Sequence, residues 1–402
     1  MVLLFLYILI FYFIKKELKL NTKSETKIFL LCTLASCLLA IPYRMYLIAQ
    51  GYKYGLANFD MQLYTTMAEQ IKDLGVRESI AAMANNWTFS QINSIQIWGY
   101  RFYVFFLKYS IYKWTFLPPV LSIYLVSIWQ LLLAAYSMLM VYNSIQKEHI
   151  QYKNLSLFLM LVAPPIWYGC VRLLREAYML YCMAGMIRTL CRHERHWKLK
   201  LLLYAVALTI FRPYYTAIMI PLLLLLYGRE KLALFMESAI FIVLAAICVQ
   251  QRVGLYNIVA VVLSPNFYNQ TRGFWQGAFD VSETSGQIQF INFIGSVWNI
   301  VVVIFALVSL IIARKLNLKN WCALGVILNI CMVYAIVYGG TTELRHKMFF
   351  VVPLIIMLNA GEFGLSQNVC SRGRRISKKA FMISFCMATL LICSILVLGL
   401  VS

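Results

Sequence analysis

The sequence predicts an all-α membrane protein, a polytopic transmembrane helical bundle of about 11–12 helices with an outer-face cap of amphipathic helices. Three observations lead to this fold class. Hydrophobic residues fill 62% of the 402 positions and charged residues only 13%, whereas soluble domains are roughly 45–50% apolar. The apolar residues fall in runs of about 15–25, the length of a membrane-spanning helix. These runs lack the alternation of apolar and polar residues that the strands of an outer-membrane barrel require.

Each apolar run predicts one helix. The first run is expected to remain in the mature protein, because no basic residue precedes it and no small-residue cleavage site follows it. We expect residues 1–402 to form a single integral membrane domain. In chain order, the runs are 1–14, 27–49, 118–143, 154–168, 177–187, 199–211, 214–227, 232–250, 291–313, 321–338, 348–360 and 380–401.

The chain is strongly basic. Lys and Arg outnumber Asp and Glu by 36 to 15, which gives a formal net charge of +21. In a soluble protein this excess would suggest nucleic acid as a partner. Here the basic residues flank apolar runs, where Lys and Arg set the orientation of a membrane protein. We therefore expect membrane lipids as partners, and no nucleic acid.

The orientation follows from the positive-inside rule. When the loop 15–27 is placed in the cytoplasm, 22 of the 36 basic residues fall in six mostly short loops on that side. The two longest loops, 50–117 and 251–290, then lie outside. The first is expected to hold an amphipathic helix from Asp60 to about Leu74, and interfacial helices over 95–117. These features predict a multi-pass protein of the inner (cytoplasmic) membrane whose active site faces outside.

Asp60 is the first candidate functional residue. It lies near the start of the first outer loop, in Asn58-Phe59-Asp60-Met61-Gln62-Leu63-Tyr64. Charge close to a bilayer is costly, so ionisable residues there are functional candidates. A helix N-cap is the structural alternative, since Asp accepts hydrogen bonds from the free amides of a first helical turn.

Three arginines form a second group. Arg172 and Arg175 follow Pro164-Pro165, and Glu176 comes next in the chain. On a helix Arg172 and Glu176 would face each other as an ion pair, which would leave Arg175 without a counter-charge. Arg212 lies between two apolar runs and has no acidic neighbour in the sequence. The planar guanidinium group suits phosphate.

The last outer turn reads Gly339-Gly340-Thr341-Thr342-Glu343-Leu344-Arg345-His346-Lys347. Arg345 and His346 are candidates for holding an anionic head group, where His346 would donate to phosphate or act as an acid. A glycine turn with snorkelling cationic side chains is the structural alternative.

Together these segments place one acid and several arginines at one face of the membrane. A carboxylate that deprotonates a hydroxyl, with arginines that stabilise a departing phosphate, is the minimum for glycosyl transfer from a lipid-linked phosphosugar. Asp60 is the expected catalytic base. The expected substrate contacts are Tyr64, Glu176 and Glu343. The expected phosphate ligands are Arg345, His346, Arg175, Arg212 and Arg172.

In these segments the chain resembles the GT-C superfamily of polytopic glycosyltransferases, which includes bacterial lipid A aminoarabinose transferases and protein O-mannosyltransferases. The resemblance rests on the Asp60 segment, on residues 164–176, and on Arg345-His346 before a helix that contains Pro353. It implies that Asp60 activates the acceptor and that Arg345 binds the donor phosphate. Met61 stands where many members carry a second acid.

The leading hypothesis is an inverting, metal-independent glycosyltransferase that moves a sugar from a polyprenyl-phosphate donor to an envelope glycan or glycolipid acceptor. No Asp-x-Asp motif occurs, so we expect neither a metal site nor a cofactor. The chain is also similar to O-antigen and capsule repeat-unit polymerases, which use undecaprenyl-diphosphate-linked donors. A lipid-linked sugar flippase is the non-enzymatic alternative, although transporters usually place charges near the bilayer midplane.

Overall fold

The computed structural model describes residues 2–56, 59–85, 96–113, 115–144, 153–192, 196–254, 257–258, 261, 298 and 318–338. Throughout these residues the regular structure is helical, with no strand, so the all-α prediction is confirmed. The expected helices at 291–313, 348–360 and 380–401 lie outside the described residues, as does most of the expected outer loop 251–290.

Three helices in the described part of the chain are long and apolar enough to cross a membrane: α2 (Lys23–Ala49), α7 (Pro119–Ser144) and α13 (Glu230–Gln250). Shorter apolar helices cover Ser156–Val171, Pro213–Leu226 and Cys322–Val337. The chain is therefore a multi-pass membrane protein.

The chain divides into two compact units. Unit 1 comprises Met1–Ser144, Leu157–Val162 and Ile166–Ala217. Unit 2 comprises Ile145–Ser156, Ala163–Pro165 and Ile218–Ser402. The arginines at 172, 175 and 212 all belong to unit 1.

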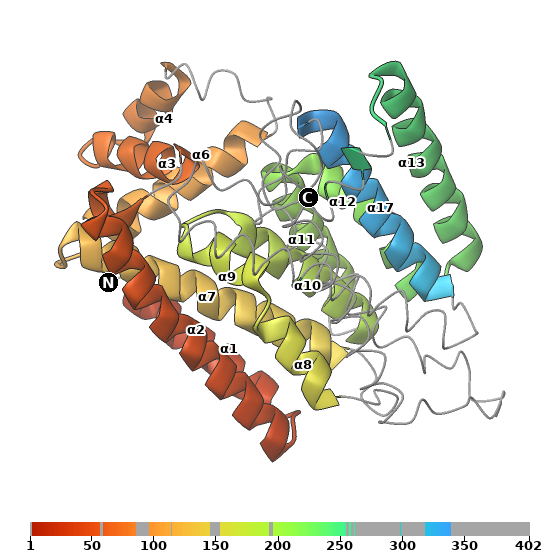
Figure 1. Ribbon diagram of the computed structural model, residues 1–402, viewed down its shortest axis with the longest axis horizontal. Coiled ribbons are helices and arrows are strands. Elements are labelled where there is room, and N and C mark those ends of the chain that lie inside the picture. The colour runs from red at the N-terminus through yellow and green to blue at the C-terminus, as the bar shows by residue number, and fades with distance from the viewer. Residues whose placement is uncertain are drawn as a thin grey trace, which may run out of the picture. The chain divides into compact units, whose positions relative to one another are not determined.

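Unit 1 is built around α7, which is in contact with α1 (Val2–Leu18), α2 and α10 (Glu176–Arg192) (Figure 1). Helix α10 also packs against α11 (Trp197–Phe211). The central position of α7 explains why most of its residues are buried, whereas α2 exposes much of its apolar surface.

A buried carboxylate fastens three of these helices together. Glu17, near the end of α1, forms an ion pair with Arg188 and lies 3.7 Å from the Nη2 atom of Arg192, both on α10. The Asn143 amide of α7 donates to the same carboxylate at 3.0 Å. The helices α1 and α10 extend past the expected ends at 14 and 187, because these charges neutralise one another inside the unit.

The expected helix 154–168 is interrupted. It forms α8 (Lys153–Leu161) and α9 (Pro164–Val171), with the break immediately before Pro164-Pro165. Proline lacks the amide hydrogen that a helix interior requires, but it is tolerated in the first turn of a new helix. The break restarts the helix just ahead of Arg172.

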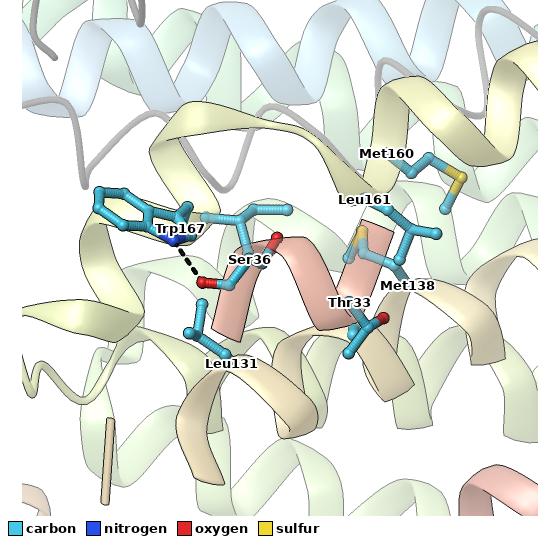
Figure 2. Close-up of a pocket in the computed structure, with 9 residues that line it drawn as sticks. Thr33, Ser36, Leu131, Met138, Met160, Leu161 and Trp167 are labelled. Atoms are coloured by element: carbon cyan, nitrogen blue, oxygen red, sulfur yellow. Dashed lines mark hydrogen bonds between the residues drawn. The ribbon is translucent and has the colours of Figure 1, made fainter. Parts of the chain in front are cut away.

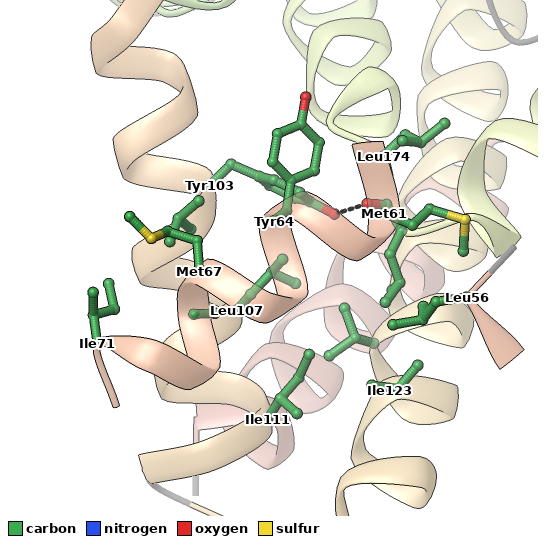
Figure 3. Packing of buried hydrophobic residues seen from close by; sticks show 14 of the residues in the cluster. Leu56, Met61, Tyr64, Met67, Ile71, Tyr103, Leu107, Ile111, Ile123 and Leu174 are labelled. Atoms are coloured by element: carbon green, nitrogen blue, oxygen red, sulfur yellow. Dashed lines mark hydrogen bonds between the residues drawn. The ribbon is translucent and has the colours of Figure 1, made fainter. Parts of the chain in front are cut away.

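The first expected outer loop folds into a helical cap. It consists of α3 (Phe59–Gln70), α4 (Val76–Asn85), α6 (Gln96–Leu107) and the π-helix η2 (Lys108–Lys113). The amphipathic helix expected from Asp60 therefore ends at Gln70, earlier than Leu74. The buried apolar side chains of this cap include Met61, Tyr64, Met67, Ile71, Tyr103, Leu107 and Ile111 (Figure 3).

The cap is packed onto the rest of unit 1. Its apolar cluster includes Ile123 of α7 and Leu174 of the segment before α10 (Figure 3). Even Lys108, which the sequence places on an interfacial helix, is buried and donates to the Leu74 carbonyl at 2.7 Å. Burial and the neighbouring Lys113 lower the pKa of Lys108. The cap thus shares a hydrophobic core with the spanning helices.

The described part of unit 2 is a helix pair. Helix α13 packs against α17 (Leu318–Tyr338). The Asn329 amide donates to the Glu237 carboxylate at 2.8 Å. At Gly325 an added Cβ would come within 2.1 Å of that carboxylate, so glycine lets Glu237 approach α17 closely.

Candidate functional site

The candidate site centres on the arginine turn, which we define as residues 172–175 between α9 and α10. Leu173 in this turn adopts a left-handed backbone conformation with φ of 52°. A non-glycine residue held there costs about 1–3 kcal/mol and persists only where its surroundings enforce it. The turn directs two arginines, Arg172 and Arg175, into the interior of unit 1, where they are 4% and 3% exposed.

Arg175 is clamped on one side only. Its guanidinium carbon lies 3.6 Å from the ring centre of Tyr100, and its Nη2 atom donates to the Tyr100 hydroxyl at 2.6 Å. The other terminal nitrogen, Nη1, is buried and has no hydrogen-bond partner among the described residues. A buried donor left unpaired costs about 1–3 kcal/mol, and more when it is charged. An anion would satisfy this atom.

Arg212 meets an acid that its own sequence neighbourhood lacks. Its Nη2 atom lies 3.6 Å from the Oε1 atom of Glu176, and both side chains are buried. Its Nη1 atom donates to the Tyr214 hydroxyl at 2.6 Å. Arg212 caps the end of α11 in an extended conformation, which the following Pro213 favours. The sequence suggested Arg172 as the partner of Glu176, and the structure adds Arg212.

Arg172 stacks on an aromatic ring. Its guanidinium carbon lies 3.9 Å from the ring centre of Tyr168, one turn earlier on α9. Arg172, Arg175, Glu176 and Arg212 thus lie on the two segments that meet at one end of the α10–α11 pair, the start of α10 and the end of α11. Among these four side chains positive charge prevails, and this is the electrostatic setting that a phosphate requires.

The cap helix α3 reaches the same end of unit 1. The ring centre of Tyr64 lies 5.6 Å from that of Tyr100, which holds Arg175, and 5.5 Å from that of Tyr103. Asp60 belongs to the first turn of α3, but its side chain lies outside the described residues. Met61, the next residue, packs in the same cluster as Leu173.

Other predicted residues cannot be placed. Glu343, Arg345 and His346 lie outside the described residues. Among the described residues no three His, Cys, Asp or Glu side chains gather where they could hold a metal ion.

Sequence reasoning missed Arg44, Tyr100 and Tyr103. Arg44 is an ionisable residue inside the apolar run 27–49, and that alone marks it as a candidate. The two tyrosines carry no such signal, because the outer loop 50–117 is rich in aromatic residues and interfacial aromatics are common.

A small cavity lies elsewhere in unit 1, between α2, α7, α8 and α9 (Figure 2). Its lining is mostly apolar, with Leu131, Met138 and Met160 on its walls, and it has room for about one water molecule. The Trp167 ring nitrogen donates to the Ser36 carbonyl at 2.9 Å beside it. None of the predicted site residues whose side chains the structure describes lines this cavity, so it is distinct from the arginine turn.

Fold and site define a class: a multi-pass helical membrane protein with buried arginines at one end of its bundle. Residues 81–272 match the model of the Alg9-like mannosyltransferase family. This match is consistent with a membrane glycosyltransferase of the GT-C superfamily, the class that the sequence predicted. The matched segment contains the arginine turn, Glu176 and Arg212, whereas Asp60 and Arg345 lie outside it. No curated protein and no solved structure matches the chain.

Proposed function

We propose that the protein transfers mannose from a polyprenyl-phosphate donor to a glycan or glycolipid acceptor at the outer face of the cytoplasmic membrane. The sugar is taken from the description of the matching family. The donor is taken from the site: a lipid-linked phosphosugar combines an apolar tail that partitions between helices with one phosphate for the arginines.

The observation that carries this proposal is Arg175. Its Nη1 atom is buried and unpartnered among the described residues, while the rest of its guanidinium is held by Tyr100. A charge-assisted hydrogen bond to a phosphate oxygen would fill the one empty position of this fork. Arg172 and Arg212 lie on the segments that flank Glu176 at the same end of the helix pair, and they are the further phosphate ligands we propose.

The proposed chemistry is a single displacement. An acceptor hydroxyl oxygen attacks the anomeric carbon and forms the new glycosidic bond. The bond between that carbon and the phosphate oxygen breaks, and polyprenyl phosphate leaves with the electron pair. The acceptor proton passes to the Asp60 carboxylate, and the arginines stabilise the negative charge on the leaving phosphate. Attack from the opposite side inverts the anomeric configuration.

The experiment is to delete the coding sequence and identify the lipid-linked sugars that accumulate by mass spectrometry. We expect a polyprenyl monophosphate that carries a single hexose to accumulate, because the enzyme that uses this donor is missing. Complementation with the Arg175→Ala variant should leave this lipid in place, whereas Arg77→Ala, an exposed arginine on α4, should clear it.

Two other results would contradict the proposal. Accumulation of complete oligosaccharide repeats on undecaprenyl diphosphate would identify a polymerase. Accumulation of the single-sugar lipid only in the inner leaflet, with transfer intact once the membrane is opened, would identify a flippase.

A further inference from the structure

Two buried side chains hold the arginine turn in its strained shape. Neither is one of the proposed phosphate ligands. The first is Arg44, near the end of α2 and 3% exposed. Its Nη2 atom donates to the Val171 carbonyl at 2.6 Å and to the Ser127 hydroxyl of α7 at 2.7 Å. Its Nη1 atom donates to the Gly55 carbonyl at 2.9 Å. One guanidinium thus joins the start of the cap to the start of the arginine turn.

The absence of a side chain at Gly55 makes room for Arg44. Gly55 has φ of +68°, and a Cβ there would lie 2.6 Å from Arg44 Cδ and 2.9 Å from its carbonyl oxygen. Only glycine lets the backbone approach so closely. Leu56 follows Gly55 in the chain, and its carbonyl accepts a hydrogen bond from the Gln62 amide of α3 at 2.7 Å. The backbone segment bound by Arg44 is therefore tied to the helix that contains Asp60.

The second side chain is Tyr103 of α6. Its hydroxyl donates to the Leu173 carbonyl at 2.5 Å, shown by the dashed line in Figure 3. The same hydroxyl accepts a hydrogen bond from the Gln130 amide at 2.8 Å. Leu173 is the residue with the left-handed backbone, so Tyr103 acts on the strained position itself.

Both supports start from one helix. Ser127 and Gln130 lie three residues apart on α7 and therefore on the same face. Ser127 accepts a hydrogen bond from Arg44, which also donates to the carbonyl of residue 171. Gln130 donates to the Tyr103 hydroxyl, which in turn donates to the carbonyl of residue 173. A strained left-handed residue persists at a functional site when several surrounding contacts enforce its conformation. Here Arg44 and Tyr103 each donate a hydrogen bond to the backbone on either side of Arg172.

We infer that Arg44 and Tyr103 are positioning residues, which preorganise the arginine turn to receive the donor phosphate and set its register with the cap helix α3. This inference rests on the proposed function for the identity of the ligand. It assigns to neither residue a contact with substrate. Each acts through the turn, by removing motions that the arginines would otherwise have to lose when the phosphate binds.

The test uses the purified full-length protein in detergent and two readouts. The first is hydrogen exchange of the backbone amides in the arginine turn. The second is the affinity for a fluorescent short-chain polyprenyl monophosphate. The variants are Tyr103→Phe, which removes one hydroxyl, and Arg44→Lys, which keeps the charge but loses the planar fork. The matched control is Tyr7→Phe, which removes a hydroxyl that donates to the Leu125 carbonyl of α7 at 2.6 Å.

We expect Tyr103→Phe and Arg44→Lys each to speed amide exchange in the arginine turn about 5- to 10-fold, the effect of losing the hydrogen bond to the backbone carbonyl of residue 173 or 171. We expect their affinity for the monophosphate to fall by a similar factor. Tyr7→Phe should change neither value. A merely structural role would lower the yield of folded protein without changing the affinity of the fraction that remains folded.

The two ideas fail in different ways. If neither variant alters exchange in the turn more than Tyr7→Phe does, the positioning role is wrong. If exchange rises but monophosphate binding stays at the wild-type value, the turn is held by these residues but its shape does not serve the phosphate, which also overturns the inference. If the wild-type protein itself does not bind the monophosphate, the proposed donor is wrong, and the exchange data still decide whether Arg44 and Tyr103 hold the turn.

Discussion

At the scale of single residues, burial changes the meaning of the arginines. In the sequence Arg175 is one of 36 basic residues, most of which are predicted to orient the chain. In the structure its guanidinium lies against the ring of Tyr100, and its buried Nη1 atom has no hydrogen-bond partner among the described residues. Arg44 is buried to the same degree but has three acceptors within hydrogen-bond distance. Arg175 is therefore suited to binding a ligand, and Arg44 to holding the backbone in place.

Asp60 supplies the prediction for the chemical step. A sugar hydroxyl is a poor nucleophile, and general-base assistance is typically worth about 10²–10⁴ in rate. Asp60→Asn keeps the shape of the side chain but removes its basicity. We expect kcat to fall by about that factor, with little change in donor KM or in expression, when mannosyl transfer is followed with purified enzyme. Near-normal turnover would contradict the role of Asp60 as the base and make Glu176 or Glu343 the next candidate.

At the scale of elements, the sequence predicts most of the described helices, since the apolar runs among the described residues form one helix each, except 154–168, which forms two. It does not predict how they end. The break before Pro164, the extension of α10 to Arg192 and the ion pair between Glu176 and Arg212 all depend on contacts between distant segments. Hydrophobic periodicity holds no information about such pairs. The same limit hid Arg44 and Tyr103, whose acceptors, the carbonyls of Val171 just before the turn and of Leu173 within it, lie 127 and 70 residues away in the chain.

The approach of α6 to α11 makes an element-scale prediction. At Gly99 an added Cβ would lie 2.6 Å from the Ile210 carbonyl oxygen and 3.0 Å from the Phe211 Cα. Gly99→Ala must therefore push α6 away from the end of α11, just where Tyr100 meets Arg175. We expect a stability loss of about 1–3 kcal/mol and a higher KM for the donor. Gly254→Ala is the control, because its nearest new contact, Asn257 Oδ1 at 3.7 Å, is an ordinary one. Equal kinetics for both variants would contradict the prediction.

The ion pairs between α1 and α10 give a second prediction at the scale of elements. Glu17→Ala leaves Arg188 and Arg192 without the buried carboxylate that they share. Removing one partner of a buried ion pair costs about 3–5 kcal/mol, so we expect a clearly lower midpoint of thermal unfolding in detergent. Glu69→Ala breaks an exposed pair with Lys53 and should have little effect. If both variants unfold at the wild-type temperature, the Glu17 cluster does not fasten α1 to the bundle.

At the scale of the whole molecule, the charge distribution predicts that the cap and the start of α11 lie on opposite sides of the membrane. The frame that places 22 basic residues in short cytoplasmic loops predicts this orientation. In the predicted orientation the arginine turn, the end of α2 and the cap helices would lie on the outer side, where a lipid-linked donor would present its head group.

Cysteine labelling of intact cells checks the orientation. Arg77→Cys on α4 and Lys198→Cys on α11 place exposed thiols at two described positions, in a background from which the eleven native cysteines have been removed. A membrane-impermeant maleimide should label position 77 in intact cells and position 198 only after the membrane is opened. The reverse pattern would place the arginine turn on the cytoplasmic side and contradict the outer-face site.

The most direct measurement is the position of the donor phosphate itself. A polyprenyl-phosphate mannose analogue, with a methylene group in place of the anomeric oxygen, cannot be cleaved and would remain bound during cryo-electron microscopy of the full-length protein. We predict a phosphate oxygen about 2.7–2.9 Å from the Nη1 atom of Arg175, the distance of a charge-assisted hydrogen bond, with Leu173 still left-handed. A phosphate bound elsewhere, with Arg175 held by Tyr100 alone, would contradict the assignment of the arginine turn as the donor site.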